Sequence, residues 1–396
     1  MLVLDKPYVS EFLLRCAEEH DLPVWPTPTA RHFANGRSLN YVELDLTSAS
    51  KAGAAPRVLA TSDNALSLIT DAMSGSELVV RIDLFKDKLA FRHATAPLHP
   101  DIEFRGIPAE GLAEVDPLDL SYPCVIKPSA GFFSMGVHAL FGPEDWDDAV
   151  QEIQAEMARV QGLYPSSVVD ASVFIIEQMI EGEEFAVDGY FDSHGLPVIL
   201  GIFRHLFASG HDVSDRVYVT SKEVIEDCLP AFTEYLTALG QATGCRDFPF
   251  HAELRRDGSG VLRPIEVNPL RFGGWCTTAD LTAQAFGLNP YLAWFRAEVP
   301  DWPAILAHRG GQTYAVVVLN NSTGIDASEI RSFDLDAVSA RFGHVIEARP
   351  IDYREYPVFG FLFVRTQSSD LSELEAILAS SLEEYVTDRL DIANGA

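Results

Sequence analysis

Apolar and polar positions alternate between helical and extended spacing over the first 80 residues of the chain. Apolar residues at helical spacing after Ser10 predict a helix capped by that serine, and a second such pattern follows Asn64, a candidate cap. Between them, residues 57–61 predict a short strand. This alternation is typical of an α/β layer. The segment has no Gly-x-Gly-x-x-Gly turn, so we expect it to be architectural and to bind no phosphate itself.

The middle of the chain is predicted to be rich in strands. Prolines at 97, 100 and 108 indicate a loop-rich connection before it. Residues 192–195 (Asp-Ser-His-Gly) form a good turn sequence between two strands. The predicted strands are 77–82, 125–128, 173–177, 185–191 and 198–203, and the predicted helices are 86–92, 143–160 and 233–243.

Beyond about residue 305, the pattern predicts strands at 313–319 and 358–364 and a helix at 371–386, with few residues suited to chemistry. We interpret this part as a third, mostly structural unit. A chain of 396 residues is also too long for one ordinary core, so two or three subdomains are expected.

Composition excludes several classes of protein. Hydrophobic residues make up 47% and charged residues 22%, as in a globular protein, and a net charge of -29 argues against binding a nucleic-acid backbone. The five cysteines lack metal or redox spacing and are expected to be reduced and mostly buried. No secretory signal is supported, and the longest apolar runs are too short to span a membrane. A cytoplasmic protein without a nucleic-acid or membrane partner is therefore expected.

Two acidic stretches carry the first chemical signal. If 251–254 and 265–269 are strands, Glu266 and Asn268 share one face, and Glu253 lies opposite its apolar neighbours. Carboxylate and amide oxygens are the ligands that Mg²⁺ prefers. Arg271 adds positive charge just beyond. The strands alone leave a second interpretation open, in which this polar face is merely hydrated.

A glycine-containing loop follows Lys127 directly. Its backbone N–H groups and the lysine ammonium could meet a phosphate together. The order differs from a Walker A loop, because Val137 stands where that loop has its lysine. A hairpin with a solvated lysine is the alternative interpretation.

An acidic linker follows, running from Glu177 to Glu184 with apolar residues between. Such a linker could line an adenine slot with its backbone groups, and Glu184 could accept hydrogen bonds from ribose hydroxyls. A solvated polar turn is the alternative.

Taken in order, these pieces resemble the ATP-grasp superfamily over roughly residues 80–295. The matching pieces are Lys88, Lys127 with the 131–136 loop, the 177–184 linker, Glu253, and Glu266-Val267-Asn268-Pro269 with Arg271. The resemblance implies an α/β (α+β) chain with an N-terminal pre-ATP-grasp domain at 1–80. It also implies an ATP-grasp domain at 81–305, with a lid subdomain at about 120–182, and a C-terminal α+β subdomain at 306–396.

The resemblance also implies roles for individual residues. Lys88 and Lys127 would contact the ATP phosphates, and Arg204 would be a further cation there. Glu253, Glu266 and Asn268 would bind Mg²⁺, with Mn²⁺ a possible substitute, and Arg271 would face the transferring group. Glu184 would hold the ribose. The loop closing over the phosphates would use Ser129, Gly131, Ser134 and Gly136, and adenine would be read by Glu177, Gln178, Met179 and Ile180.

The implied enzyme is an ADP-forming ligase that joins a small carboxylate to an amine through an acyl phosphate, and amino acids are the expected substrates. No covalent protein nucleophile is needed, and no convincing nucleophile and base pattern is found. Carboxylation, acyl-thiol formation, phosphoryl transfer without ligation and an inactive ATP-binding protein are the alternatives. A homodimer is the base expectation. No motif identifies the two substrates, and the roles of His205, His211 and His251 stay open.

Overall fold

The computed structural model describes residues 1–43, 57–130, 136–160, 170–208 and 215–389. Near its N-terminus four short parallel strands form a sheet in the order β3-β2-β1-β4. The strands are β1 (Leu2–Val3), β2 (Pro23–Val24), β3 (Asn40–Tyr41) and β4 (Leu59–Ala60), and the helices are α1 (Glu11–Glu19), α2 (Pro28–Ala34) and α4 (Asp63–Ala72). The predicted α/β layer is confirmed. Ser10 caps α1 as predicted, but α4 is capped by Ser62, so the predicted cap at Asn64 is wrong by two residues.

The strand predicted at 77–82 is wrong, because these residues begin helix α5 (Glu77–Lys86). Ser76 accepts a hydrogen bond from the Val79 N–H and caps the helix, and Ile82 and Phe85 are buried one turn apart. Helix α6 (Lys88–Thr95) follows at once, with the Asp87 carboxylate accepting from the N–H groups of Leu89 and Ala90. The helix predicted at 86–92 therefore exists but begins two residues later.

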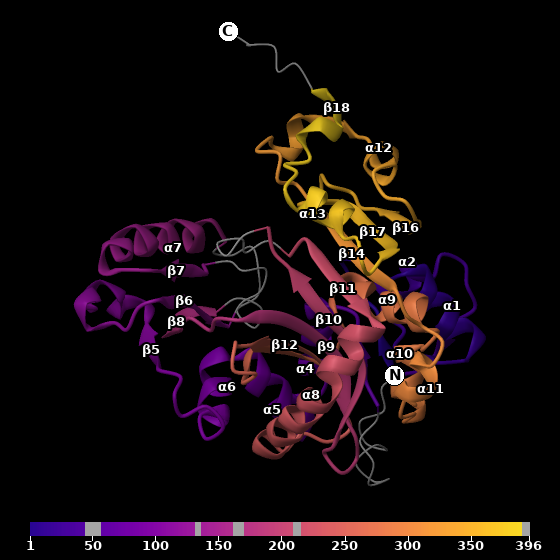
Figure 1. The fold of residues 1–396 in the computed structure, drawn as a ribbon. Coiled ribbons are helices and arrows are strands. Elements are labelled where there is room, and N and C mark those ends of the chain that lie inside the picture. The colour runs from indigo at the N-terminus through magenta and orange to yellow at the C-terminus, as the bar shows by residue number, and fades with distance from the viewer. Residues whose placement is uncertain (44–56, 131–135, 161–169, 209–214, 390–396) are drawn as a thin grey trace.

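A small antiparallel sheet in the order β5-β8-β6-β7 comes next. Its strands are β5 (Phe104–Pro108), β6 (Cys124–Ala130), β7 (His138–Leu140) and β8 (Asp170–Gln178), with 3-10 turns at Ala109–Glu114, Pro117–Asp119 and Pro143–Asp145. Helix α7 (Trp146–Val160) packs Trp146 and Ile153 against Ile126 and Phe174. The predicted strands and helix here are confirmed, and the loop-rich connection contains β5. Figure 1 shows this sheet to one side of the main body.

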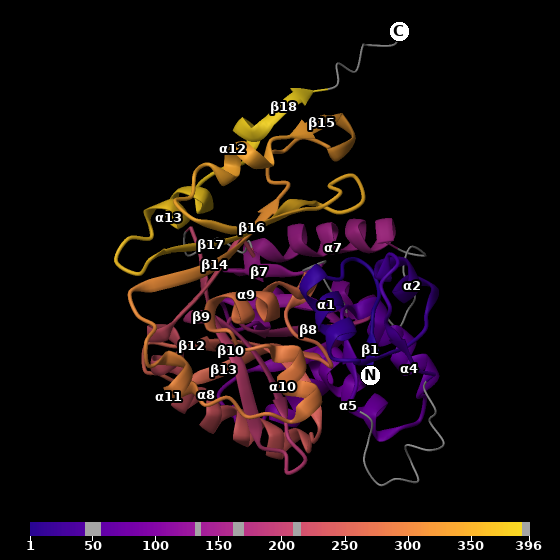
Figure 2. The same ribbon diagram turned by 90° about the vertical axis from the view of Figure 1, so that its right-hand side faces the viewer.

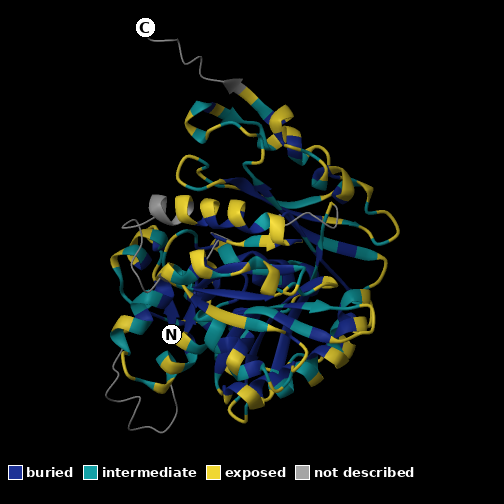
Figure 3. Ribbon diagram, turned by 90° about the vertical axis from the view of Figure 1, so that its left-hand side faces the viewer, coloured by how far each residue is buried: buried dark blue, intermediate teal, exposed yellow. Residues whose placement is uncertain are grey.

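The main body is an antiparallel sheet of eight strands in the order β13-β12-β9-β10-β11-β14-β17-β16. The predicted turn at 192–195 joins β9 to β10, as expected. The strands are β9 (Glu183–Phe191), β10 (Pro197–Leu206), β11 (Val217–Ser221), β12 (Phe248–Arg256), β13 (Leu262–Pro269), β14 (Gln312–Asn320), β16 (Val345–Pro350) and β17 (Val358–Gln367). Figure 3 shows these strands largely buried beneath their covering helices.

The two faces of the large sheet are covered differently. Helix α8 (Lys222–Thr243) packs Phe232 and Leu236 on the face that carries Phe185 and Ile202. It begins earlier than the helix predicted at 233–243. Helix α9 (Thr277–Phe286) places Leu281 against Phe203 on the other face. A 3-10 turn at Gly274–Cys276 precedes α9, and α10 (Pro290–Arg296) and α11 (Trp302–Leu306) follow it.

The last part of the chain shares the large sheet, because β14, β16 and β17 extend it without a break. Figure 2 shows the remaining C-terminal elements above these strands. They are β15 (Ile330–Phe333) paired with β18 (Val386–Arg389), α12 (Leu335–Ser339), α13 (Ser372–Leu378) and 3-10 turns at Ala327–Glu329 and Glu383–Tyr385. The helix predicted at 371–386 is wrong beyond Leu378, because Leu382 takes a positive φ of 64° and the chain turns into β18.

The five cysteines are all buried and free, as their spacing predicted. Among the residues described, no helix combines the length and the apolar character needed to cross a membrane.

Candidate functional site

Strands β12 and β13 bring the three predicted metal ligands together. Glu253 and Glu266 are direct cross-strand partners, and Asn268 pairs with His251 two positions along. The Asn268 amide nitrogen lies 3.1 Å from a Glu266 carboxylate oxygen and 3.5 Å from one of Glu253. The predicted common face of these residues is therefore confirmed.

The two carboxylates of this strand pair differ in acidity. Burial, then the charge of Glu266, raises the pKa of Glu253 well above its ordinary value. Burial also opposes ionisation of Glu266, but Lys88 and Lys127 outweigh it and lower the pKa of Glu266. Two facing carboxylates without a cation between them repel each other, and a divalent ion relieves that repulsion.

The donor set fits a magnesium ion that is also bound by phosphate. Within the described ranges, no group of three or more His, Cys, Asp or Glu side chains is arranged to hold a metal by itself. The two carboxylates supply only part of a shell, because the Asn268 amide turns its nitrogen to them and its oxygen to Arg271. Mg²⁺ is usually held in this way, by one or two carboxylates together with substrate phosphates and water.

Two predicted cations border the acidic strand pair. The Lys88 ammonium, at the start of α6, lies 3.7 Å from the Glu266 carboxylate. Arg271 donates to the Asn268 side-chain oxygen at 2.8 Å, and its buried Nε has no hydrogen-bond partner in the part of the chain that the structure describes. Leu270, with φ of 54°, turns the chain between Asn268 and Arg271. The structure thus gathers Lys88 and Arg271 around the carboxylates.

Lys127 lies on β6 in a buried ion cluster. Its ammonium lies 2.6 Å from one oxygen of Glu177 on β8, and Arg92 of α6 bonds the other oxygen. Burial opposes ionisation of Glu177, but Lys127 and Arg92 prevail and hold its pKa at about 2. Burial lowers the pKa of Lys127. Sequence reasoning missed Arg92 because no local motif surrounds it.

The loop predicted to close over phosphates is only partly described. Ser129 hydrogen-bonds the Asp87 carboxylate, and its hydroxyl oxygen accepts from the Leu89 N–H at 3.2 Å. Gly136 has a positive φ of 68°, which favours glycine. Gly131 and Ser134 lie outside the described residues, as does His211.

The predicted adenine segment connects the small sheet to the large one. The N–H groups of Gln178 and Met179 donate to the carbonyls of Glu103 and Pro123 at 2.9 and 3.0 Å, and the Ile180 carbonyl accepts from Arg255 at 2.5 Å. These contacts hold the segment extended.

Glu184 is the second residue of β9 and lies on the same face as Glu253. One of its oxygens lies 3.0 Å from His205 Nδ1, and the other lies 2.8 Å from Arg255. His205 also stacks on the ring of Tyr218 with a centroid distance of 4.3 Å. A ribose would have to share Glu184 with these two partners.

Arg204 is not brought to the acidic strand pair. Its register partner is Phe185, whose side chain packs beneath α8, on the face away from Glu253. Its guanidinium lies 3.8 Å from the Glu183 carboxylate. The adjacent His205 faces the site instead.

Asp188 is a central residue that the sequence did not reveal. It is fully buried, lies 2.7 Å from His251 Nδ1, and accepts from the Gly273 N–H at 3.0 Å and the Thr278 hydroxyl at 2.5 Å. It therefore fixes the turn after Arg271 to the face that carries Glu253. The only signal was a charged residue at an alternating position inside an apolar strand.

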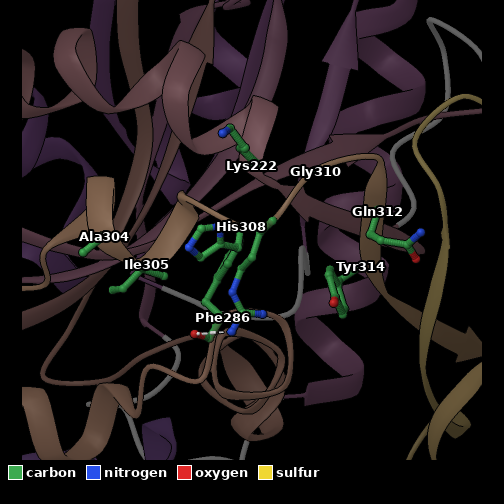
Figure 4. Close-up of a pocket in the computed structure, with 9 residues that line it drawn as sticks. Lys222, Phe286, Ala304, Ile305, His308, Gly310, Gln312 and Tyr314 are labelled. Carbon is green, nitrogen blue, oxygen red and sulfur yellow. Dashed lines mark hydrogen bonds between the residues drawn. The ribbon is translucent and has the colours of Figure 1, made fainter.

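A cavity of about 390 Å³ lies elsewhere, between the start of α8 and the 304–314 segment (Figure 4). The Lys222 and Arg309 side chains that line it already have protein partners. Arg309 donates to the Phe286 carbonyl at 3.0 Å, and the Lys222 ammonium lies 3.5 Å from Glu226. No carboxylate pair lines it, so it does not compete with the strand pair as a reaction centre.

Comparisons with known proteins agree with this fold. Residues 120–279 match the family model of the ATP-grasp domain. The fold is similar to that of an L-amino acid ligase from Bacillus licheniformis, at 18% identity and a TM-score of 0.62 over 94% of each chain. It is also similar to a carboxyaminoimidazole ribonucleotide synthase from Aspergillus clavatus, at 13% identity and a TM-score of 0.61 over 94% of this chain and 95% of that one. No curated protein matches in sequence.

Proposed function

We propose that this chain, in which residues 120–279 match the ATP-grasp domain, joins a small carboxylate to an amine using ATP and releases ADP and phosphate. Amino acids are the proposed substrates. The L-amino acid ligase of similar fold is consistent with this choice.

The observation that carries the proposal is the arrangement of charges on β12 and β13. Glu253 and Glu266 face each other across the strand pair. Lys88 and Lys127 are close enough to lower the pKa of Glu266, and Arg271 donates to Asn268. Bringing a carboxylate to a triphosphate is opposed by Coulomb repulsion. Fixed cations and a metal site in a buried setting offset that repulsion.

Glu253, Glu266 and Asn268 would hold Mg²⁺, which when bound neutralises charge on the phosphate oxygens. Mn²⁺ is expected to substitute. The substrate carboxylate attacks the γ-phosphorus of ATP, giving an acyl phosphate and ADP. The amine then attacks the acyl carbon, the carbon–oxygen bond to phosphate breaks, and the amine loses a proton.

Arg271 is the residue we propose to meet the negative oxygen of the second step. Its Nη2 donates to the Asn268 side-chain oxygen at 2.8 Å and lies 3.8 Å from the Asp63 carboxylate, and its buried Nε has no hydrogen-bond partner among the described residues. The Gly273 N–H already donates to Asp188 and Thr278, so it stabilises the turn and is not available to a substrate oxygen. The Gly274 N–H is the remaining backbone candidate.

The test is an ADP-release assay with Mg-ATP and pairs of amino acids, with the product identified by mass. Glu266→Gln and Arg271→Ala are expected to lose activity by a factor of about 100 or more while staying folded. Arg263→Ala, on the same strand but paired with Asp101 and Asp257, is the control that should keep activity.

Several outcomes would contradict parts of this proposal. Formation of AMP and pyrophosphate would exclude an acyl phosphate route. Full activity in Glu266→Gln would exclude the metal assignment. ADP release with a carboxylate alone, accompanied by a stable phosphorylated product, would favour a kinase.

A further inference from the structure

Arg92 joins the small sheet to the acidic strand pair through a single buried guanidinium. Its side chain is 4% exposed, and its Nε donates to the Glu177 carboxylate on β8. Its Nη1 donates to the Pro264 carbonyl at 2.7 Å, and its Nη2 lies 3.5 Å from the Ile265 carbonyl. These carbonyls belong to β13, directly before Glu266. One side chain therefore fixes the spacing between the two sheets where they meet.

The same guanidinium changes the charge around Lys127. Glu177 is shared between Lys127 at 2.6 Å and Arg92, so the buried cluster holds two cations and one anion. Its net charge is one positive. Without Arg92, Glu177 would fully balance Lys127, and the lysine would present no net charge to a phosphate.

Helix α6 supports this arrangement along its length. At its start, Lys88 lies 3.7 Å from Glu266, and the Leu89 N–H donates to Ser129 on β6 at 3.2 Å. Figure 1 shows α6 beside the small sheet and next to α5. The helix thus contacts β6, β8 and β13, which carry Lys127, Glu177 and Glu266.

We propose that Arg92 is a positioning residue for ATP binding: it leaves Lys127 a net positive charge for the phosphates and holds β8 and β13 at a fixed spacing. This inference rests on the proposed function, because it takes Lys127 as a phosphate contact. The three guanidinium nitrogens of Arg92 bond Glu177 and the carbonyls of Pro264 and Ile265, so its effect on ATP is exerted through Glu177 and the β13 backbone.

The test measures binding of a non-hydrolysable ATP analogue with Mg²⁺ by titration calorimetry. Arg92→Met is expected to weaken binding about 10-fold or more, because it removes both the positive charge and the hydrogen-bond donors of the guanidinium. Arg92→Lys keeps the charge and should lose less. Arg105→Met is the matched control, since Arg105 is exposed on β5 of the same small sheet and should leave binding unchanged.

Steady-state kinetics separates positioning from general damage to the fold. In Arg92→Lys the KM for ATP should rise while the KM values for carboxylate and amine stay within about twofold of the wild type. Equal rises in all three KM values, or unchanged affinity for the analogue in Arg92→Met, would overturn the inference. If Arg92→Met does not fold, the Arg92→Lys result decides. A wild-type protein that binds no analogue would instead overturn the proposed function.

Discussion

Gly273 illustrates how tightly the turn after Arg271 is built. A Cβ at this position would lie 2.1 Å from the Thr278 hydroxyl oxygen, and the Gly273 N–H donates to Asp188 at 3.0 Å. We expect Gly273→Ala to push Thr278 away, destabilise the fold by about 1–3 kcal/mol and displace Arg271. Turnover should fall about 10-fold or more. Denaturant unfolding and the ADP-release assay measure the two effects.

The neighbouring glycine provides the control for this prediction. No atom of the described residues other than its chain neighbours lies within 4 Å of a Cβ built on Gly274. Gly274→Ala should therefore leave stability close to that of the wild type. Similar losses in both variants would show that the contact with Thr278 is not the cause.

The residues of the site divide into those that sequence could reveal and those that it could not. Glu253, Glu266 and Asn268 could be predicted because strand alternation sets their common face, and the pairing of β12 with β13 makes them neighbours. Arg92 and Asp188 act through partners 85 residues away in the chain. No local pattern encodes such contacts, since tertiary packing alone creates them.

At the scale of elements, local signals succeeded where caps and turns agreed with the apolar pattern. They failed at α5, where Val79 and Val80 favour a strand, but the Ser76 cap and the burial of Ile82 and Phe85 select a helix. Arg204 shows a different limit. The sequence predicts that Arg204 lies at the end of a strand. Which face of the sheet its side chain takes depends on the register of β10 with β9, and local sequence does not determine that register.

The contact between the loop after α6 and helix α8 predicts a pH dependence of stability. His99 is buried, and its Nε2 lies 3.0 Å from the Tyr235 hydroxyl. Burial, then the charge of Arg92, lowers the pKa of His99 from 6.5 to about 4. Between these values the unfolded chain binds the proton that the folded chain excludes, so stability is lost as the pH falls from 6.5 to 4. The loss should reach roughly 3 kcal/mol.

Urea unfolding at a series of pH values measures this loss. His99→Gln cannot titrate, so its stability should fall less than that of the wild type over the same pH window. His93→Gln, an exposed position on α6, leaves His99 in place and should show the full wild-type loss. An acid response in His99→Gln equal to that of the wild type would contradict the assignment.

At the scale of the whole molecule, an acidic chain concentrates its positive charge locally. The protein has 58 acidic and 29 basic residues, yet Lys88, Arg92, Lys127 and Arg271 all lie at the meeting point of the two sheets. This explains how a chain with a net charge of -29 can still present a site suited to phosphates.

The C-terminal strands are tied to the site by a second buried ion pair. Arg349 on β16 donates to Asp280 on α9 at 2.8 Å and to the Trp275 carbonyl at 3.0 Å, with both charged side chains at most 3% exposed. Trp275 has a positive φ of 59°, a strained conformation that its surroundings must hold. Arg349 therefore joins the last part of the large sheet to the turn that follows Arg271.

Removing one member of the Arg349–Asp280 ion pair should lower the free energy of unfolding far more than removing both. Arg349→Met leaves Asp280 buried without its cation, so we expect a loss of about 3–5 kcal/mol in denaturant unfolding. Adding Asp280→Asn should recover part of it, because the unpaired charge is then gone. Arg341→Met, an exposed site in the same region, should be neutral. If the double variant is less stable than Arg349→Met, the unpaired carboxylate is not the source of the loss, and the donor bond to Trp275 becomes the stronger explanation.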